Sequence, residues 1–389
     1  KSFEMGYTPN TILWDVLTTF PTVTGNYQPN NYDLEERGPV LVRNAIQGSL
    51  NIPAVKMVYM VGVENALDFA TSLGYTSFDD HSAFGLSLVL GGGEVKLIEH
   101  VNAYATFANK GERNEIASIL RVEDSDGAIL QEWKERDGKK VIDENVANTI
   151  THVLSDNGAR TPFFGASSYL QLGDRPVAAK TGTTNDYRDG WLIGYTPSLA
   201  VGVWGGNNDN TEMNRGAGGS TVAGPIWNGF MQRALSGTAI ESFTAPTIEQ
   251  TGKPVLDGEI SSERLIVDRA SGLLATEYTP DSYREERLYA EYHSILHYVN
   301  RSDPTGAPLK DLTDDAMYES WEAGIQEWIV VQEEELGVEI STEDPPTEED
   351  DLHIPANFPT VRISSPDRNE KFDDRNITIE ISASAPRGI

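Results

Sequence analysis

The sequence predicts an α+β fold in which helices cover an antiparallel sheet. Three short apolar runs, at residues 177–179, 191–195 and 199–204, are separated by turn residues, and this spacing predicts a three-stranded meander. In the stretches before these runs, apolar residues recur at intervals of three and four, as in amphipathic helices. Helices of this kind bury their apolar faces against a neighbouring sheet, so the whole is expected to be a sandwich of helices around a sheet.

The individual elements follow from local signals. The clearest helix is expected over residues 94–109, and a second one, capped by its first residue, over 143–154. A hairpin is expected around the Asp-Gly pair at 126–127, and a further helix over 224–235. The segment 6–38 is rich in Pro, Asn, Thr and Tyr, which predicts an extended loop.

Chain length indicates about two domains, and composition changes near the end. Residues 333–351 contain ten acidic side chains, no basic ones and a Pro-Pro pair, which is typical of a solvated linker. Two alternating strands follow, and two strands alone are too few for a stable module. We expect a domain over residues 1–330, an acidic linker over 331–355, and a truncated β-sandwich module of immunoglobulin-like type over 356–389.

Composition excludes several functions. A net charge of −30 disfavours nucleic-acid binding, and the absence of cysteine removes disulfides and thiolate chemistry. No apolar run is long enough to span a bilayer, so no membrane contact is expected within this sequence. His293 and His297 have the spacing of zinc ligands, but Ser294 occupies the position where a metalloprotease carries glutamate. We therefore expect no metal and no cofactor.

Two short strings contain polar residues of interest, and the first of them suits anion binding. One is Lys-Thr-Gly-Thr-Thr at residues 180–184, where a glycine allows close backbone approach beside an ammonium and several hydroxyls. The other is Ser49-Leu50-Asn51, at the end of a helical stretch. Each string is weak by itself, because the first is also typical of a surface turn and the second of a helix cap. Their joint occurrence, in surroundings that are specific at both places, carries the interpretation.

With these surroundings, the chain resembles the transpeptidase domain of class A penicillin-binding proteins. The signature motifs of that family are Ser-x-x-Lys, Ser-x-Asn and Lys-Thr-Gly. The resemblance covers about residues 1–300 and implies the fold shared by these transpeptidases and the serine β-lactamases. The segments that carry it are residues 6–9 (Gly-Tyr-Thr-Pro), 49–55, 90–95, 175–184 and 189–197.

The resemblance implies a peptidoglycan DD-transpeptidase. In that family a serine forms an acyl-enzyme with D-Ala-D-Ala stem peptides, and β-lactams acylate the same serine. Matched motif to motif, Ser49 would relay a proton to the leaving amine, Asn51 would bond the stem-peptide amide, and Lys180 would hold Ser49 and supply positive potential. The backbone N–H of Thr183 would form half of an oxyanion hole. The residues expected to bind substrate are Thr181, Gly182, Thr183 and Thr184.

One motif of the family has no counterpart in this sequence. No Ser-x-x-Lys occurs in a plausible position, so we expect the nucleophile and its lysine upstream of Lys1 and expect this chain alone to be inactive. A glycosyltransferase domain and a membrane anchor would precede them, on the extracytoplasmic face of a bacterial membrane. Two alternatives stay open: a carboxypeptidase or β-lactamase that uses water as acceptor, and a catalytically dead binding or sensor domain.

Overall fold

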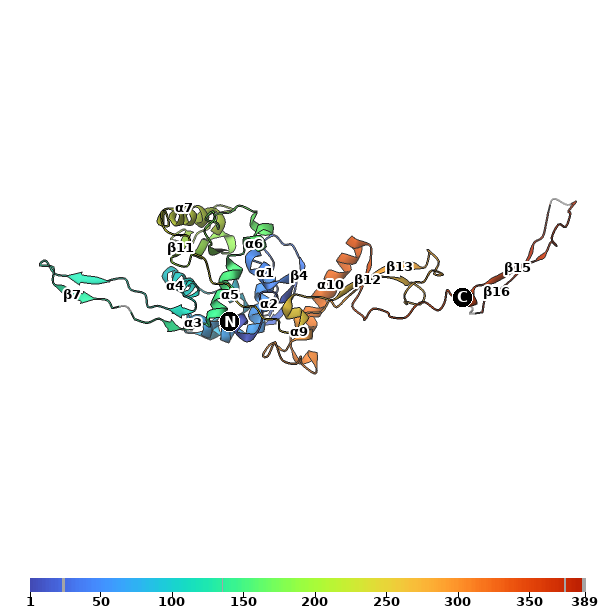
Figure 1. Cartoon of the computed structure of the whole chain (residues 1–389), viewed down its shortest axis with the longest axis horizontal. Helices are drawn as coiled ribbons and strands as arrows, with labels where there is room; N and C mark the ends of the chain where they lie inside the picture. Colours follow the sequence, from blue (N-terminus) through green and yellow to red (C-terminus); the bar gives the residue numbers. More distant parts are fainter. Residues whose placement is uncertain (23–24, 135, 374–375, 387–389) are drawn as a thin grey trace. The chain divides into compact units, whose positions relative to one another are not determined.

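The computed structural model describes residues 1–22, 25–134, 136–373 and 376–386. Contacts divide the chain (Figure 1) into two compact units. The first unit is Lys1–Glu259 with Ser294–Ile325, and the second unit is Ile260–His293 with Gln326–Ile389.

The division expected from the sequence, at residues 330 and 355, stays a prediction. The boundary between the two compact units falls within α10 (Tyr318–Leu336), and β14 (Glu339–Ser341) lies in the range expected to be a linker. The expected module at 356–389 includes residues 374–375 and 387–389, which lie outside the described residues.

A three-stranded antiparallel sheet lies at the centre of the first unit, and it confirms the predicted meander. Its order is β11 (Ala200–Gly206), β10 (Asp189–Tyr195) and β9 (Ala178–Thr183). Trp191 of β10 lies opposite Gly182 on one side and Trp204 on the other. Among the strands that the structure describes, β9 pairs only with β10, so its second side is a free edge.

Helices cover both faces of this sheet, as predicted. They are α4 (Leu97–Ala108) and α5 (Glu144–Leu154) on one face and α7 (Gly224–Ala234) on the other. Ala178 packs with Tyr195 among side chains of α4 and α5, whereas its neighbour Ala179 packs with Trp227 of α7. Figure 1 shows α7 above the sheet and α4 below it. Successive side chains of β9 therefore point to opposite faces of the sheet and contribute to two separate hydrophobic cores.

The contact between α7 and the sheet requires glycine at position 194. A Cβ there would lie 2.5 Å from the ring of Trp227 and 2.9 Å from the Cβ of Ala179. The indole of Trp227 is fully buried, and its N–H donates to the carbonyl of Val201 at 3.1 Å. Gly194 therefore lets the largest core side chain of α7 lie directly on the strand.

The expectation of a loop over residues 6–38 is wrong in part. β1 (Ile12–Asp15) is buried at all four positions and pairs with β4 (Gly38–Leu41) in antiparallel fashion. A run of four buried residues is too short to show a period, and its Pro- and Asn-rich surroundings hid it. A small hairpin of β2 (Phe20–Thr22) and β3 (Gly25–Tyr27) follows β1.

A projecting ribbon and further helices complete the first unit. The predicted hairpin is confirmed as β6 (Arg121–Glu123) paired with β7 (Ile129–Glu132), within a ribbon that projects from the unit (Figure 1). At the base of this ribbon, β5 (Glu112–Arg113) pairs with β8 (Lys139–Lys140). The other helices are α1 (Val42–Gly48), α2 (Asn51–Val61), α3 (Val63–Ser72), α6 (Asn157–Phe164), α8 (Pro254–Asp257) and α9 (Ile295–Tyr298).

The second unit contains strands and the C-terminal part of α10. β12 (Ser262–Asp268) and β13 (Arg284–Ala290) form an antiparallel pair, and β14 adds to β13 in parallel. β15 (Thr360–Ser365) and β16 (Glu380–Ser384) form a separate antiparallel pair, in the region where two strands are expected.

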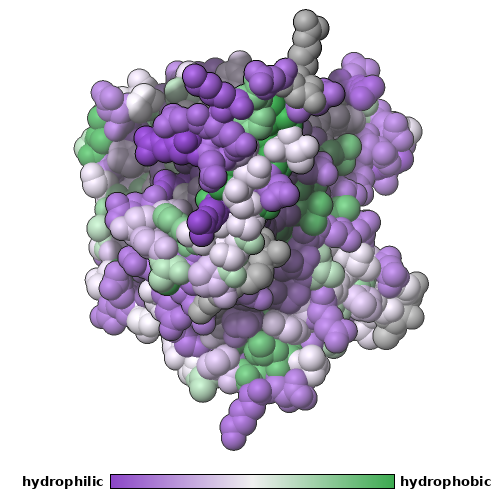
Figure 2. Space-filling model, turned by 90° about the vertical axis from the view of Figure 1, so that its right-hand side faces the viewer, coloured by the Kyte–Doolittle hydropathy of each residue, from purple (hydrophilic) through white to green (hydrophobic). Residues whose placement is uncertain are grey.

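The surface is largely polar on the face shown in Figure 2. Hydrophilic residues cover most of the face shown in Figure 2, and smaller hydrophobic areas lie among them. Within the described part of the chain, no helix combines the length and apolar character needed to cross a bilayer.

Candidate active site

Ser49 and Asn51 occupy the corner between α1 and α2. Ser49 ends α1 in the left-handed conformation, with φ 55° and ψ 40°, and its N–H donates to the carbonyl of Ile46 at 3.2 Å. A non-glycine residue in this region carries a strain of about 1 kcal/mol, so the surrounding structure must hold it. The turn stops one helix and allows the next to begin at Asn51.

Lys180 connects this corner to the sheet. Its Nζ donates to the hydroxyl of Ser49 at 2.8 Å and to the carbonyl of Thr181 at 2.8 Å. The two strings noted in the sequence are therefore in direct contact. Because the Ser49 oxygen accepts from the ammonium, its own proton is available to a further acceptor.

The environment of Lys180 lowers its pKa from 10.5 to about 8. Removal from water is the main cause, and the positive charge of Arg160 adds to it. A pKa of about 8 leaves the side chain mainly protonated at neutral pH, so it acts there as a cation and a hydrogen-bond donor.

The backbone of β9 presents polar groups at its free edge. The N–H of Thr184 donates to the carbonyl of Asp189 at 3.2 Å, which marks these two residues as a hydrogen-bonded pair of the β9–β10 ladder. Antiparallel pairs alternate between bonded and non-bonded, so Gly182 also bonds to β10, whereas Thr181 and Thr183 do not. The N–H of Thr183 and the carbonyl of Thr181 are therefore directed to the edge.

A second chain segment supports Thr183 from the face of the sheet. The N–H of Gly219 donates to the Thr183 hydroxyl at 3.0 Å. A Cβ on Gly219 would lie 2.4 Å from the carbonyl oxygen of Trp191 and 2.7 Å from that of Gly182, so only glycine allows this approach. The Thr183 hydroxyl keeps its own proton for another partner.

Thr184 is engaged within its own loop. Its hydroxyl donates to a carboxylate oxygen of Asp189 at 2.9 Å and accepts from the N–H of the same residue at 2.8 Å. The indole N–H of Trp204 donates to the other carboxylate oxygen at 2.8 Å. Among the four residues expected to bind substrate, the side chain of Thr184 thus forms hydrogen bonds to Asp189, across the turn between β9 and β10.

The first turn of α2 is capped by residues that sequence reasoning missed. The side-chain oxygen of Asn31 accepts from the N–H of Asn51 at 2.9 Å, and its amide donates to buried Asp15 at 2.7 Å. The first N–H groups of a helix have no partner within it, so Asn31 takes the place of a local cap. The side chain of Asn51 is oriented by donating to the carbonyl of Asn30 at 2.7 Å. Asn31 lies in the segment expected to be a loop, where nothing singles it out.

Arg160 of α6 is a second residue that sequence reasoning missed. Its side chain is buried and donates to Gln47 of α1 at 3.1 Å and, more weakly, to the carbonyl of Ala179 at 3.4 Å. These two acceptors lie just before Ser49 and Lys180, so one guanidinium supports both sides of the site. An arginine within an amphipathic pattern carries no signal of such a role.

Comparison with known proteins identifies the family and the fold. Residues 13–232 match the family described as "Penicillin binding protein transpeptidase domain", which is more than half of the chain. The matched range includes Ser49, Asn51 and residues 180–184. The resemblance stated from the sequence is thereby confirmed.

Curated relatives carry the same family name. The chain is 31% identical over 226 residues to penicillin-binding protein 1A of Aquifex aeolicus, which is 58% of this chain and 30% of that protein. It is 33% identical over 254 residues to penicillin-binding protein 2D of Bacillus subtilis, covering 63% and 36%. The match to penicillin-binding protein 1A of Neisseria gonorrhoeae has 28% identity and covers 80% and 39%. The chain thus spans about a third of the length of these relatives.

Solved structures agree. The penicillin-binding protein PonA1 of Mycobacterium tuberculosis aligns with a TM-score of 0.56 and 26% identity, over 64% of this chain and 68% of that one. The same protein in complex with penicillin V aligns with a TM-score of 0.55 and 27% identity, over 64% and 69%. This chain belongs to the penicillin-binding protein transpeptidase family.

Proposed function

We propose that this chain supplies most of the active site of a peptidoglycan DD-transpeptidase, in which β9 binds the D-alanyl end of a stem peptide. The serine that becomes acylated would come from a segment outside this sequence, since no serine here is followed three residues later by lysine. The observation that carries the proposal is the 2.8 Å hydrogen bond from Lys180 to Ser49, which joins the two motifs.

Substrate binding would use the free edge of β9. An extended peptide can add to such an edge through the Thr181 carbonyl and the Thr183 N–H. The ammonium of Lys180 and the hydroxyls of Thr181 and Thr183 would receive the terminal carboxylate of D-alanine. In this arrangement Thr184 shapes the loop and does not contact the ligand.

Catalysis would proceed by acyl transfer. The serine oxygen attacks the carbonyl between the two D-alanines, and its proton passes to the lysine of the missing motif. Ser49 gives its own proton to the departing amine of the last D-alanine and receives the proton held by that lysine in its place, while Lys180 holds the Ser49 hydroxyl for this transfer. The Thr183 N–H would stabilise the oxyanion of the tetrahedral intermediate, a contact typically worth about 3 kcal/mol. An amine from a second strand then takes the acyl group, and the serine is released.

Penicillin labelling tests this proposal. The chain of residues 1–389 is expected not to label with a fluorescent penicillin, whereas a protein extended upstream to include Ser-x-x-Lys should label. In the extended protein, Lys180→Ala should slow labelling by about 100-fold or more, because it removes a charge that stabilises the acylation transition state. Lys110 is half-exposed and pairs with Glu144 on the surface, so Lys110→Ala is the matched control.

Two outcomes would contradict the proposal. Labelling of residues 1–389 would show that the nucleophile lies within this sequence. Equal labelling of the Lys180→Ala and Lys110→Ala variants would remove Lys180 from the site. Incubation of the extended protein with a D-Ala-D-Ala peptide and an amino acceptor then separates cross-linking, which we expect, from hydrolysis.

The setting of the reaction belongs to the same proposal. Peptidoglycan stem peptides and β-lactams would be the ligands, and cross-linking would take place on the extracytoplasmic face of the bacterial membrane. A membrane anchor and a glycosyltransferase domain would lie in other parts of the protein.

A further inference from the structure

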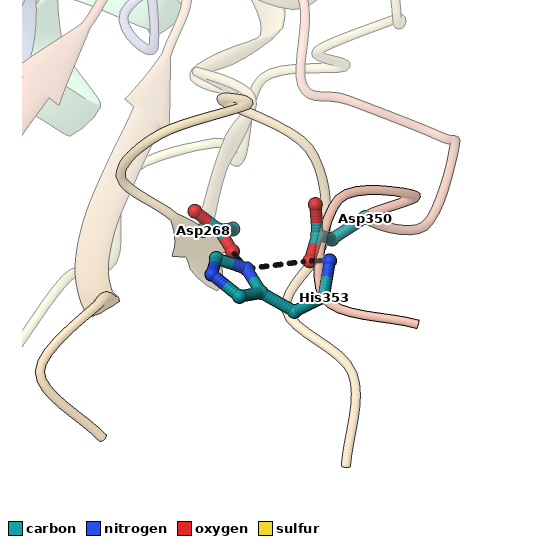
Figure 3. Close-up of side chains that lie close together, drawn as sticks. All are labelled: Asp268, Asp350 and His353. Carbon is teal, nitrogen blue, oxygen red and sulfur yellow. Dashed lines mark hydrogen bonds and ion pairs between the residues drawn. The ribbon is translucent and has the colours of Figure 1, made fainter. Parts of the chain in front are cut away.

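The second unit contains a cluster of three side chains that can bind a metal. They are Asp268, Asp350 and His353, and one ligand atom from each lies within 4.8 Å of the others. Asp268 is the last residue of β12, and the other two lie in the segment after β14 (Figure 3). The sequence did not single them out, because they come from two distant stretches with no common motif.

The backbone orients both carboxylates toward a common point. One oxygen of Asp268 accepts from the N–H of Ala270 at 2.7 Å, and one oxygen of Asp350 accepts from the N–H of Leu352 at 3.0 Å. The other oxygen of each faces the Nδ1 atom of His353, at 3.1 Å for Asp350 and closer for Asp268. Carboxylates that bind metals are held by hydrogen bonds in the same way.

The charges at this point do not balance. The side chains of Asp268 and Asp350 are both fully buried, with 0% exposure, and His353 is 17% exposed. Among the residues that the structure describes, no lysine or arginine forms an ion pair with either carboxylate. The Nδ1 atom carries at most one hydrogen, which cannot serve both carboxylates fully, and even a protonated imidazole leaves one negative charge. The N–H groups of Leu352 and His353 compensate the charge of Asp350 in part, but a buried charge with no full opposite charge beside it is costly.

We infer that Asp268, Asp350 and His353 bind a divalent metal ion, and that its chemical class is that of Zn²⁺. Two carboxylate charges and a neutral imidazole would balance such an ion. The nitrogen ligand favours a transition metal over Ca²⁺ or Mg²⁺, which prefer oxygen ligands alone. Three protein ligands leave a fourth position for water.

The ion would fasten two segments that already touch. The N–H of Leu274 donates to the carbonyl of Glu348 at 2.9 Å, and the N–H of Asp350 donates to the carbonyl of Leu274 at 2.8 Å. A metal held by Asp268 from one segment and by Asp350 and His353 from the other would strengthen the same connection. Its role would be structural.

Titration of the metal-free 389-residue chain with Zn²⁺ tests the inference by calorimetry. One ion should bind per chain, and His353→Gln should weaken its affinity by at least about 100-fold, since it removes a direct ligand. His81 is the matched control, because it pairs with the single carboxylate of Glu64 at 2.6 Å and belongs to no such cluster among the residues with described positions. His81→Gln should leave affinity unchanged, and Ca²⁺ should bind far more weakly than Zn²⁺. Absence of Zn²⁺ binding, or equal affinity in both variants, would overturn the inference.

A measurement on the unmodified chain covers the case in which His353→Gln fails to fold. Of the six histidines, Zn²⁺ should shift the ring nitrogen signals of one. That ring should show proton contacts to Tyr283, whose ring centre lies 4.9 Å from that of His353. Shifts at no histidine, at several, or at a ring without contact to Tyr283 would each refute the site.

Discussion

Replacement of Arg160 should disturb both the stability of the first unit and the electrostatics of Lys180. The guanidinium donates to Gln47 at 3.1 Å and to the carbonyls of Leu154, Leu170 and Ala179 at 2.6, 3.3 and 3.4 Å. Arg160→Met keeps much of the side-chain volume and removes every donor. Two of the acceptors that lose a partner, Gln47 and Ala179, lie near the end of α1 and at the start of β9.

The size of the effect follows from these bonds. A hydrogen bond to a charged group typically contributes about 1.5–3 kcal/mol, and one left unmade at a buried acceptor costs about 1–3 kcal/mol. The four bonds are not additive, and loss of the buried cation relieves its own desolvation, which also holds its pKa down to about 10. We therefore expect the free energy of unfolding to fall by about 3 kcal/mol, as is typical when a buried polar network is broken.

The same substitution should raise the pKa of Lys180. Burial is the main cause of its lowered pKa and is retained, but the repulsion from Arg160 is removed. Urea unfolding followed by tryptophan fluorescence measures the stability change, and carbon NMR of the lysine side chains measures the pKa. Arg160→Lys keeps a positive charge without the planar set of donors, so it should lose stability while the pKa of Lys180 changes less.

Arg160 would not have the role described here if Arg160→Met changed the free energy of unfolding by less than about 1 kcal/mol, the range of ordinary surface substitutions. A pKa of Lys180 that is equal in the wild type and in Arg160→Met would refute the electrostatic part alone.

Three further predictions concern the surroundings of the site. Lys56 is buried and desolvation lowers its pKa from 10.5 to about 7, so unfolding takes up a proton at this side chain between these pH values. Its share of the rise in the free energy of unfolding between about pH 7 and about pH 9 should be about 2 kcal/mol, in addition to the share of Lys180, whose pKa is also lowered. The rise in Lys56→Met should be smaller by that amount, and an equal rise in the two proteins would contradict this. Asn31→Ala should lower the free energy of unfolding by about 1–2 kcal/mol in urea titrations. Asn31→Asp should lower it further, because it sets two carboxylates against each other at Asp15; equal effects of the two variants would argue against the contact with Asp15. Gly219→Ala should slow penicillin labelling of the extended protein by about 10-fold or more, since its Cβ would displace the support of Thr183. Gly229→Ala, whose Cβ would meet nothing closer than 3.8 Å, should label normally, and equal labelling of the two variants would contradict the contact.

Elements with a long repeat or a distinct turn could be predicted from the sequence. The period of residues 94–109 extends over several turns and corresponds to α4, and Asp143 caps α5 as expected, accepting from the N–H of Asn145 at 2.8 Å. The three strands of the meander were separated by clear turn residues. The strand β1 could not be predicted, because four buried residues show neither alternation nor a helical period.

The residues of the candidate site also differ in whether the sequence could predict them. Residues 180–184 and Ser49 were found because short motifs specify them in a family. The supporting residues Asn31 and Arg160 were not found, since their roles depend on which backbone groups three-dimensional packing brings beside them. A buried hydrogen-bond network leaves no period in the sequence. The same holds for the cluster around His353, whose ligands come from two segments.

The charge distribution would allow a protein this acidic to receive the anionic peptide end that we propose as its ligand. The net charge is −30, yet the site holds two cations, Arg160 and Lys180, and neither forms an ion pair with any residue that the structure describes. The nearest acid in electrostatic terms, Asp156, is paired with Arg43 at 2.9 Å. Buried cations without an anionic partner are costly unless a ligand provides the opposite charge. Residues with perturbed pKa values, such as these two, are concentrated at functional sites. The carboxylate of a D-alanyl peptide would provide that charge, while the acidic surface would repel the same peptide elsewhere.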